Sequence, residues 1–196
     1  MKTLAICALS LTLAVGIAFP QGKGKGGGRG RGPQPPGLAI SSPDFEDGGV
    51  IPDKYTGAVP NPVSPQLTWT NVPAGTQSFA LIFHDPDVAI GRNPSDVLHW
   101  MVFNIPGTAK GLPGGMSDQA KLADGTIQAK NLRGAVGFMG PGNGAQNPYH
   151  HYTFELFALD TKLALDENAS RDDVLTAMAG HILGKGVLVG RFKRPQ

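Results

Sequence analysis

Apolar and polar positions alternate in short segments along the second part of the chain, and glycine, proline, asparagine and aspartate separate these segments. Segments 78–85, 97–106 and 150–160 are rich in the aromatic and β-branched residues that favour strands. Trp69 and Trp100 lie in such alternation and are predicted to be core residues. Many short strands between turn-forming residues predict a mainly β domain, built as an antiparallel sheet or sandwich.

Segment 150–160 has the most regular alternation. Every second residue from Tyr152 to Ala158 is apolar and falls on one face of the predicted strand. The opposite face is also apolar in its second half, at Phe157 and Leu159. This pattern predicts a strand that is covered on both faces.

One helix is predicted near the C-terminus. Ser170 fits the N-cap position, and Asp173 supplies the carboxylate at the third helical position that completes a capping box. Gly180 and Gly184 bracket the predicted end of the helix. Segment 186–192 then predicts a final short strand. The apolar stripe of the helix, at spacings of three and four residues, consists of Val174, Leu175, Met178 and Ile182.

Residues 1–18 have the features of a secretory signal peptide. Lys2 precedes an apolar run over 4–18, and small residues at its end fit a signal-peptidase site. The run is too short for a transmembrane span, so we expect none in the mature chain. Cys7 is the only cysteine and would leave with the signal peptide, so the mature protein would contain no disulfide. We therefore expect export to the periplasm or beyond.

The positive charge of the chain is concentrated before the predicted domain. Residues 19–37 are rich in glycine, lysine, arginine and proline and predict a disordered linker, followed by a domain at 38–196. Five of the 17 basic residues precede residue 33, which leaves 12 against 15 acidic residues in the rest. The domain is therefore mildly acidic, which argues against a nucleic-acid partner.

Four of the five histidines fall in two places. His84 and His99 flank a loop with several aspartates, and His150 and His151 begin a later strand. Neighbours on a strand point to opposite faces, so at most one of this last pair can share a pocket with His99 and Asp85. The spacing matches no compact zinc signature, and no Gly-x-Ser-x-Gly elbow is present. The pattern alone leaves open a metal site, an acid–base pair, a binding pocket and a polar loop.

Four short motifs follow one another along the chain: Asp-Pro-Asp at 85–87, His-Trp at 99–100, Gly-Pro at 140–141 and His-x-Tyr at 150–152. With the segment LTWTNVPAGTQSFALIF before them and GHILGKGVLVGRF after them, they resemble the phosphatidylethanolamine-binding protein family. The similarity is to its bacterial Raf kinase inhibitor-like (YbhB/YbcL) branch and runs from about residue 38 to residue 192.

The resemblance implies an antiparallel β-sandwich with one or two short helices near the C-terminus. It also implies a pocket for a small phosphorylated or carboxylated ligand or a phospholipid headgroup. The sequence departs from the family at His151, where many members carry arginine, and at 88–90, where an Ala-Pro pair is usual. The residues that match the family pocket are Asp85, Asp87, His99, Gly140, Pro141, His150 and Tyr152.

This set of side chains suits an anion. Two imidazoles and a tyrosine hydroxyl can donate hydrogen bonds to it. A buried aspartate would fix the histidine tautomer and raise the histidine pKa, which favours the charged form. Gly140 would let the backbone approach the ligand closely. Alternatively, Asp85 and Asp87 only cap turns through Asx-type hydrogen bonds.

The leading hypothesis is an exported, non-enzymatic binding protein that needs no cofactor. Regulation or inhibition of a protein partner is known within the wider family, but an exported protein would not meet a cytosolic kinase. One alternative is a metal-dependent or acid–base hydrolase that uses Asp85, His99 and His150. Another is an interaction protein whose pocket is vestigial.

Overall fold

The structure is a computed structural model, and it describes residues 37–196. The predicted signal peptide and all but the last residue of the predicted linker lie outside the described residues. None of the helices in the described part is long and apolar enough to cross a membrane.

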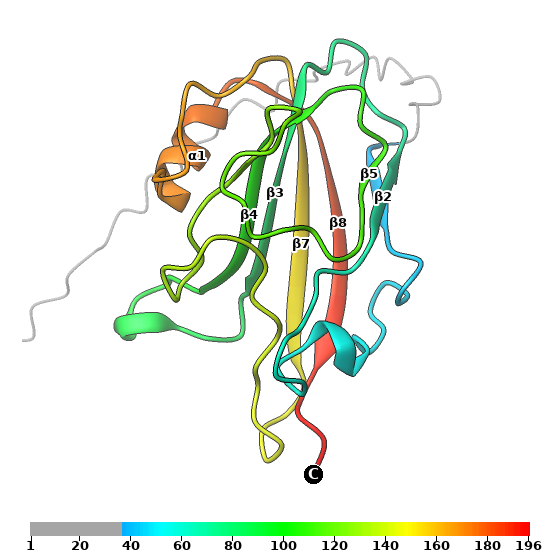
Figure 1. The fold of residues 1–196 in the computed structure, drawn as a ribbon, viewed down its shortest axis with the longest axis vertical. Helices are drawn as coiled ribbons and strands as arrows, with labels where there is room; N and C mark the ends of the chain where they lie inside the picture. Colours follow the sequence, from blue (N-terminus) through cyan, green and yellow to red (C-terminus); the bar gives the residue numbers. More distant parts are fainter. Residues whose placement is uncertain (1–36) are drawn as a thin grey trace, which may run out of the picture. The chain divides into compact units, whose positions relative to one another are not determined.

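Two antiparallel sheets form the framework of the described residues (Figure 1). The larger sheet has the order β6-β4-β3-β7-β8, and the smaller one the order β1-β2-β5. The larger sheet comprises β3 (Ser78–Asp85), β4 (Val97–Pro106), β6 (Ile127–Gln128), β7 (His150–Leu159) and β8 (Ile182–Phe192). The smaller sheet comprises β1 (Ala39–Ser41), β2 (Leu67–Thr70) and β5 (Gly111–Leu112). The helical elements are η1 (Asp53–Tyr55), η2 (Ile90–Arg92) and α1 (Arg171–Met178).

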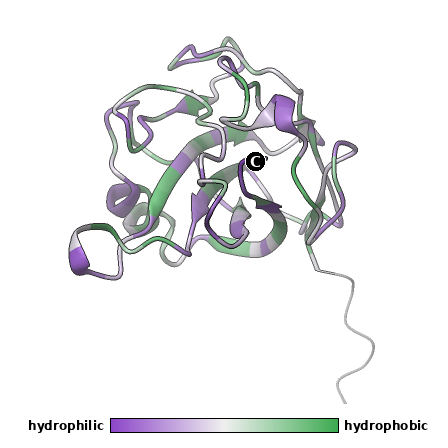
Figure 2. Ribbon diagram, turned by 90° about the horizontal axis from the view of Figure 1, so that it is seen from below, coloured by the Kyte–Doolittle hydropathy of each residue, from purple (hydrophilic) through white to green (hydrophobic). Residues whose placement is uncertain are grey.

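The main hydrophobic core joins the inner face of the large sheet to the small sheet. Trp69 of β2 and Trp100 of β4 both belong to it, and each is at most 2% exposed, so both predictions are confirmed. The even-numbered face of β7, from Tyr152 to Ala158, also belongs to this core. The strands that curve through the middle of Figure 2 carry long hydrophobic stretches, in keeping with this burial.

A second core covers the other face of the large sheet. Phe157 and Leu159 of β7 pack there with Val174 and Met178 of α1. The prediction that β7 is covered on both faces is therefore confirmed. Together the two sheets and the two cores give the sandwich-like β architecture that the sequence predicts.

Helix α1 begins as predicted and ends earlier. The Ser170 side chain accepts the N–H of Asp173, and the Asp173 carboxylate accepts the N–H of Ser170, which completes the capping box. The predicted stripe is wrong at Leu175, which is 40% exposed. It is also wrong at its C-terminal end, because the backbone is extended at Ala179 and left-handed at Gly180. Ile182 is instead the first residue of β8, which pairs along the whole of β7 and is longer than the predicted strand at 186–192.

Candidate functional site

A cavity of about 370 Å³ opens where one end of β3 meets the first residues of β4 and β7. Because β3 is antiparallel to both neighbours, its last residue, Asp85, lies beside the beginnings of these strands. Strand β4 contributes His99, and β7 contributes His150 and Tyr152. The segment that contains Gly140 forms a further wall. Four of the seven residues in the family pattern are thus brought together from three strands, and Gly140 adds a fifth.

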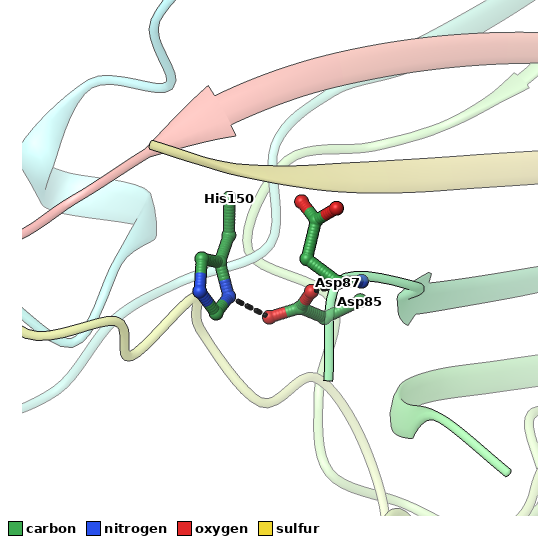
Figure 3. Close-up of side chains that lie close together, drawn as sticks. All are labelled: Asp85, Asp87 and His150. Atoms are coloured by element: carbon green, nitrogen blue, oxygen red, sulfur yellow. Dashed lines mark hydrogen bonds and ion pairs between the residues drawn. The ribbon is translucent and has the colours of Figure 1, made fainter. Parts of the chain in front are cut away.

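Asp85 holds His150 in place. Its Oδ2 atom accepts a hydrogen bond from Nδ1 of His150 at 2.8 Å, as Figure 3 shows. Its Oδ1 atom accepts the backbone N–H of Asp87 at 3.0 Å, which is an Asx turn. The Asp85 side chain is only 4% exposed, so both hydrogen bonds form in a dry environment. Asp85 therefore lines the cavity and also forms the Asx turn that the alternative interpretation predicts, while its role toward a ligand stays a prediction.

His99 is buried at the cavity wall and donates from Nδ1 to the carbonyl oxygen of Met139 at 2.8 Å. A carbonyl only accepts, so this hydrogen bond places the proton on Nδ1 and leaves Nε2 as an acceptor in the neutral ring. Burial lowers the pKa of His99, and the charge of Arg133 lowers it further. The Met139 carbonyl and the charge of Asp85 raise it, but not enough to compensate. The expectation of a raised pKa is therefore wrong for His99, because desolvation outweighs the opposite effect of the Asp85 carboxylate.

Tyr152 supplies a hydroxyl that stays protonated. The residue is 1% exposed, and its ring meets the His99 ring edge-on with centroids 5.3 Å apart. Burial, followed by the negative charge of Asp85, raises the pKa of Tyr152 well above its ordinary value. The hydroxyl is therefore a donor at any physiological pH.

Asp87 lies at the rim and outside the cavity lining. Its carboxylate accepts the backbone N–H of His151 at 2.6 Å and the His151 Nδ1 at 2.9 Å. Burial raises the pKa of Asp87, but the hydrogen bonds from His151 outweigh it and lower the pKa overall. His151 is exposed and points away from His150, as strand alternation predicts.

Gly140 and Pro141 both make contacts within the protein that account for their presence without a ligand. A Cβ on Gly140 would lie 2.9 Å from Cβ and Cγ of Pro62, so glycine lets this segment pack against residues 56–62. This contact differs from the expected close approach of a ligand. Pro141 is buried and is not part of the cavity lining, and its carbonyl accepts the N–H of Gly57 at 2.7 Å.

Sequence reasoning did not identify Arg133, Asn143 or Asn147, which also line the cavity. Arg133 lies between positions with no regular alternation, so no periodic signal marks it. Asn131 and Gly134 on either side of it are turn-forming residues and indicate a loop here, but they do not indicate a cavity. Its position at the cavity depends on the tertiary path of 131–144.

Among residues 37–196, Asp85, Asp87 and His150 are the one group with potential metal-ligand atoms within 4.8 Å of one another. A metal ion there would compete with the hydrogen bonds from His150 to Asp85 and from His151 to Asp87. Figure 3 shows the Asp87 carboxylate turned away from the Asp85–His150 pair. The geometry therefore favours two separate His–Asp pairs.

Comparison with known proteins places this fold and motif order in one family. The profile of the phosphatidylethanolamine-binding protein family matches residues 41–193, and the chain belongs to that family. Within it, the similarities below place the chain in the bacterial YbhB/YbcL branch.

Relatives are found in archaea and bacteria. A UPF0098 protein of Methanothermobacter thermautotrophicus is 44% identical over 151 residues, covering 76% of this chain and 95% of the relative. The UPF0098 protein YbhB of Escherichia coli is 35% identical over 164 residues, covering 79% of this chain and 99% of the relative. The crystal structure of Escherichia coli YbcL superposes with a TM-score of 0.70 at 30% identity, covering 81% of this chain and 99% of that one.

Proposed function

We propose that this protein is a non-enzymatic binding protein whose cavity takes a small phosphorylated or carboxylated ligand, such as a phospholipid headgroup. The observation that carries the proposal is the convergence of two imidazoles and a protonated tyrosine hydroxyl on one partly dry cavity. Ligand cavities in proteins commonly have this size and this mixture of apolar walls with a few polar groups.

The two imidazoles are held so that each keeps one nitrogen free. His99 and His150 both use Nδ1 within the protein, and no described residue bonds to Nε2 of either ring. A hydrogen phosphate or a carboxylic acid can donate its O–H to such a nitrogen. A fully ionised ligand instead favours protonation of the ring beside it, because a neighbouring opposite charge raises the histidine pKa.

The lining favours binding over hydrolysis. No serine, threonine, cysteine or lysine is among the residues that line this cavity, so a covalent nucleophile of these types has no place in it. Asp85 is engaged by two hydrogen bonds within the protein and is not free to act as a general base on water. The same argument applies to a metal-dependent hydrolase, because the candidate metal ligands already form the two His–Asp hydrogen bonds.

Export and regulation are further parts of the proposal. The predicted signal peptide at 1–18 supports a site of action in the periplasm or outside the cell. A regulated partner protein would then be found in the same compartment. Cell fractionation, with sequencing of the mature N-terminus, tests this part, and a mature chain that retains Met1 in the cytosol would contradict it.

Calorimetric titration with inorganic phosphate and with phosphorylethanolamine tests the binding function. We expect His99→Gln and His150→Gln to weaken binding about tenfold, since each removes a hydrogen bond to a charged group. The matched control is His181→Gln, because His181 is exposed and pairs with Asp160 outside the cavity. Unchanged affinity in both cavity variants would contradict the proposal, and stoichiometric zinc in the purified protein would favour the metal-dependent alternative.

A further inference from the structure

A second cavity, of about 750 Å³, lies beside the first. The two share Arg133, Met139, Gly140 and Gly142 in their linings. The shared residues belong to the loop between β6 and β7, so this loop forms part of the wall of both cavities. The far wall of the second cavity includes residues 59–62.

Arg133 is the one arginine common to both linings. It is exposed, and no described residue forms an ion pair or hydrogen bond with its guanidinium group. By contrast, Arg194 of the second cavity donates from Nη2 to the carbonyl oxygen of Gly57 at 2.7 Å. Arg133 therefore offers its full set of five N–H donors to a ligand.

A cation such as Arg133 would compensate the charge of an anion in the first cavity. It contains the buried carboxylate of Asp85, and the Nδ1 donors of His99 and His150 are already used within the protein. An anion that enters would meet a negative charge and two ring nitrogens that accept when neutral. Arg133 is close enough for its charge to act on His99. A guanidinium group binds phosphate and carboxylate in a bidentate manner, which suits this position.

We propose that the two cavities form one bipartite site, in which Arg133 holds the anion at the junction and the second cavity holds the organic group attached to that anion. This inference rests on the proposed anion-binding function. The ligand class it names is a phosphate ester with a polar substituent, and inorganic phosphate would fill the site only in part.

The lining of the second cavity indicates the polarity of the substituent. Asn61, Asp118 and Arg194 supply amide, carboxylate and guanidinium groups, while Val59, Pro60, Pro62, Val136 and Phe138 supply apolar surface. A substituent with hydroxyl or amino groups on a short carbon chain matches this mixture. The volume is about twice that of the first cavity, which leaves room for several such groups.

Calorimetry with inorganic phosphate and with sn-glycerol 3-phosphate tests this arrangement. We expect the wild-type protein to bind the ester about tenfold more tightly than inorganic phosphate. Arg133→Gln should weaken both probes about tenfold or more, and Arg133→Lys should recover only part of that loss, because lysine keeps the charge without the bidentate geometry. Lys162→Gln removes one positive charge at an exposed residue outside both linings and is the matched control.

A bulky side chain that fills the second cavity tests the role of that cavity separately from the role of the first. Asn61 is exposed, lines only the second of the two cavities, and has no hydrogen bond to another described residue. We expect Asn61→Trp to leave phosphate binding unchanged and to remove most of the preference for the ester, whereas Asn61→Ser keeps that preference. Cosedimentation with vesicles that contain phosphatidic acid, against vesicles of phosphatidylcholine alone, shows whether the ester comes from a lipid or from a soluble metabolite.

The outcomes distinguish this inference from the proposed function. If phosphate binds and depends on His99, but neither Arg133→Gln nor Asn61→Trp changes any affinity, the bipartite site is wrong and the anion cavity stands. If neither probe binds the wild-type protein, both are wrong. If Arg133→Gln weakens binding while Asn61→Trp leaves the ester preference intact, the substituent lies outside the second cavity and the proposal is overturned.

Discussion

Asp85 and His150 lie 65 residues apart in the sequence and are joined by a hydrogen bond of 2.8 Å between Oδ2 and Nδ1. The carboxylate side chain is 4% exposed and the imidazole 17%, so water does little to screen the pair. The pair also sets the face that His150 presents, because Nδ1 is held and Nε2 is left for a ligand. One buried carboxylate thus links the end of β3 to the start of β7 at the mouth of the cavity.

The first prediction concerns this pair. Asp85→Asn should lower the free energy of unfolding by about 1–3 kcal/mol, because a buried charge-assisted hydrogen bond is lost. Denaturant unfolding measures the effect. The control is Asp160→Asn, which removes a pair of similar length between Asp160 and His181 with both side chains about half exposed. That change should lower the free energy of unfolding by less than about 1 kcal/mol. Equal losses in the two variants would show that burial does not make the Asp85–His150 pair more stabilising than an exposed pair.

The second prediction concerns pH and His99. Burial holds the pKa of His99 below its ordinary value of 6.5, so the unfolded chain takes up this proton at a higher pH than the folded protein does. The stability that neutral His99 contributes is therefore present above pH 6.5, and it falls as the pH drops below 6.5 toward the folded pKa. Urea unfolding between about pH 5 and pH 8 should show this decline, and His99→Gln should flatten it. A decline of equal size in His99→Gln would assign the effect to other groups.

The third prediction concerns the loop wall of the cavity. Gly140→Ala places a Cβ 2.9 Å from Pro62 and 3.0 Å from the backbone carbon of Thr56, so one of the two segments must move. We expect a loss of about 1–3 kcal/mol in the free energy of unfolding, as for other overpacked sites. Gly142→Ala is the control, because nothing lies within 4 Å of its added Cβ. Equal thermal stability of the two variants would argue against the tight contact.

The fourth prediction concerns the loop between β3 and β4, which contributes Val88 to the cavity. Asp96 at the end of this loop accepts from Nδ1 of His84 at 2.6 Å and also pairs with Arg171 of α1. Asp96→Ala would remove the carboxylate that both partners share in a largely buried place, which should cost about 2–3 kcal/mol. Amide hydrogen exchange should then be faster over residues 86–96 than in the wild type. Unchanged exchange would mean that other contacts hold the loop.

Much of the framework could be predicted because its strands carry a regular pattern. The bounds of β3 and β4 agree with the sequence prediction, since apolar runs there end at turn-forming residues. The start of α1 was predictable from Ser170 and Asp173, because a capping box is a local interaction. Its end was not, since Ile182 continues the helical spacing by chance and pairing with β7 decides its structure.

The candidate site was predictable only in part, for a related reason. Strand alternation and the family resemblance together indicated Asp85, His99 and His150, whose directions follow from their strands. The direction of the His99 pKa shift depends on how deeply the ring is buried, and sequence does not measure burial. Arg133 reaches the cavity through an irregular loop, so its position depends on contacts distant in sequence.

A crystal structure of the protein grown with phosphorylethanolamine tests the central claim most directly. The proposal predicts density for the phosphate inside the cavity, with its oxygens in hydrogen-bond contact with Nε2 of His99 and the hydroxyl of Tyr152. A ligand bound elsewhere on the surface, or an empty cavity under conditions where calorimetry detects binding, would contradict it.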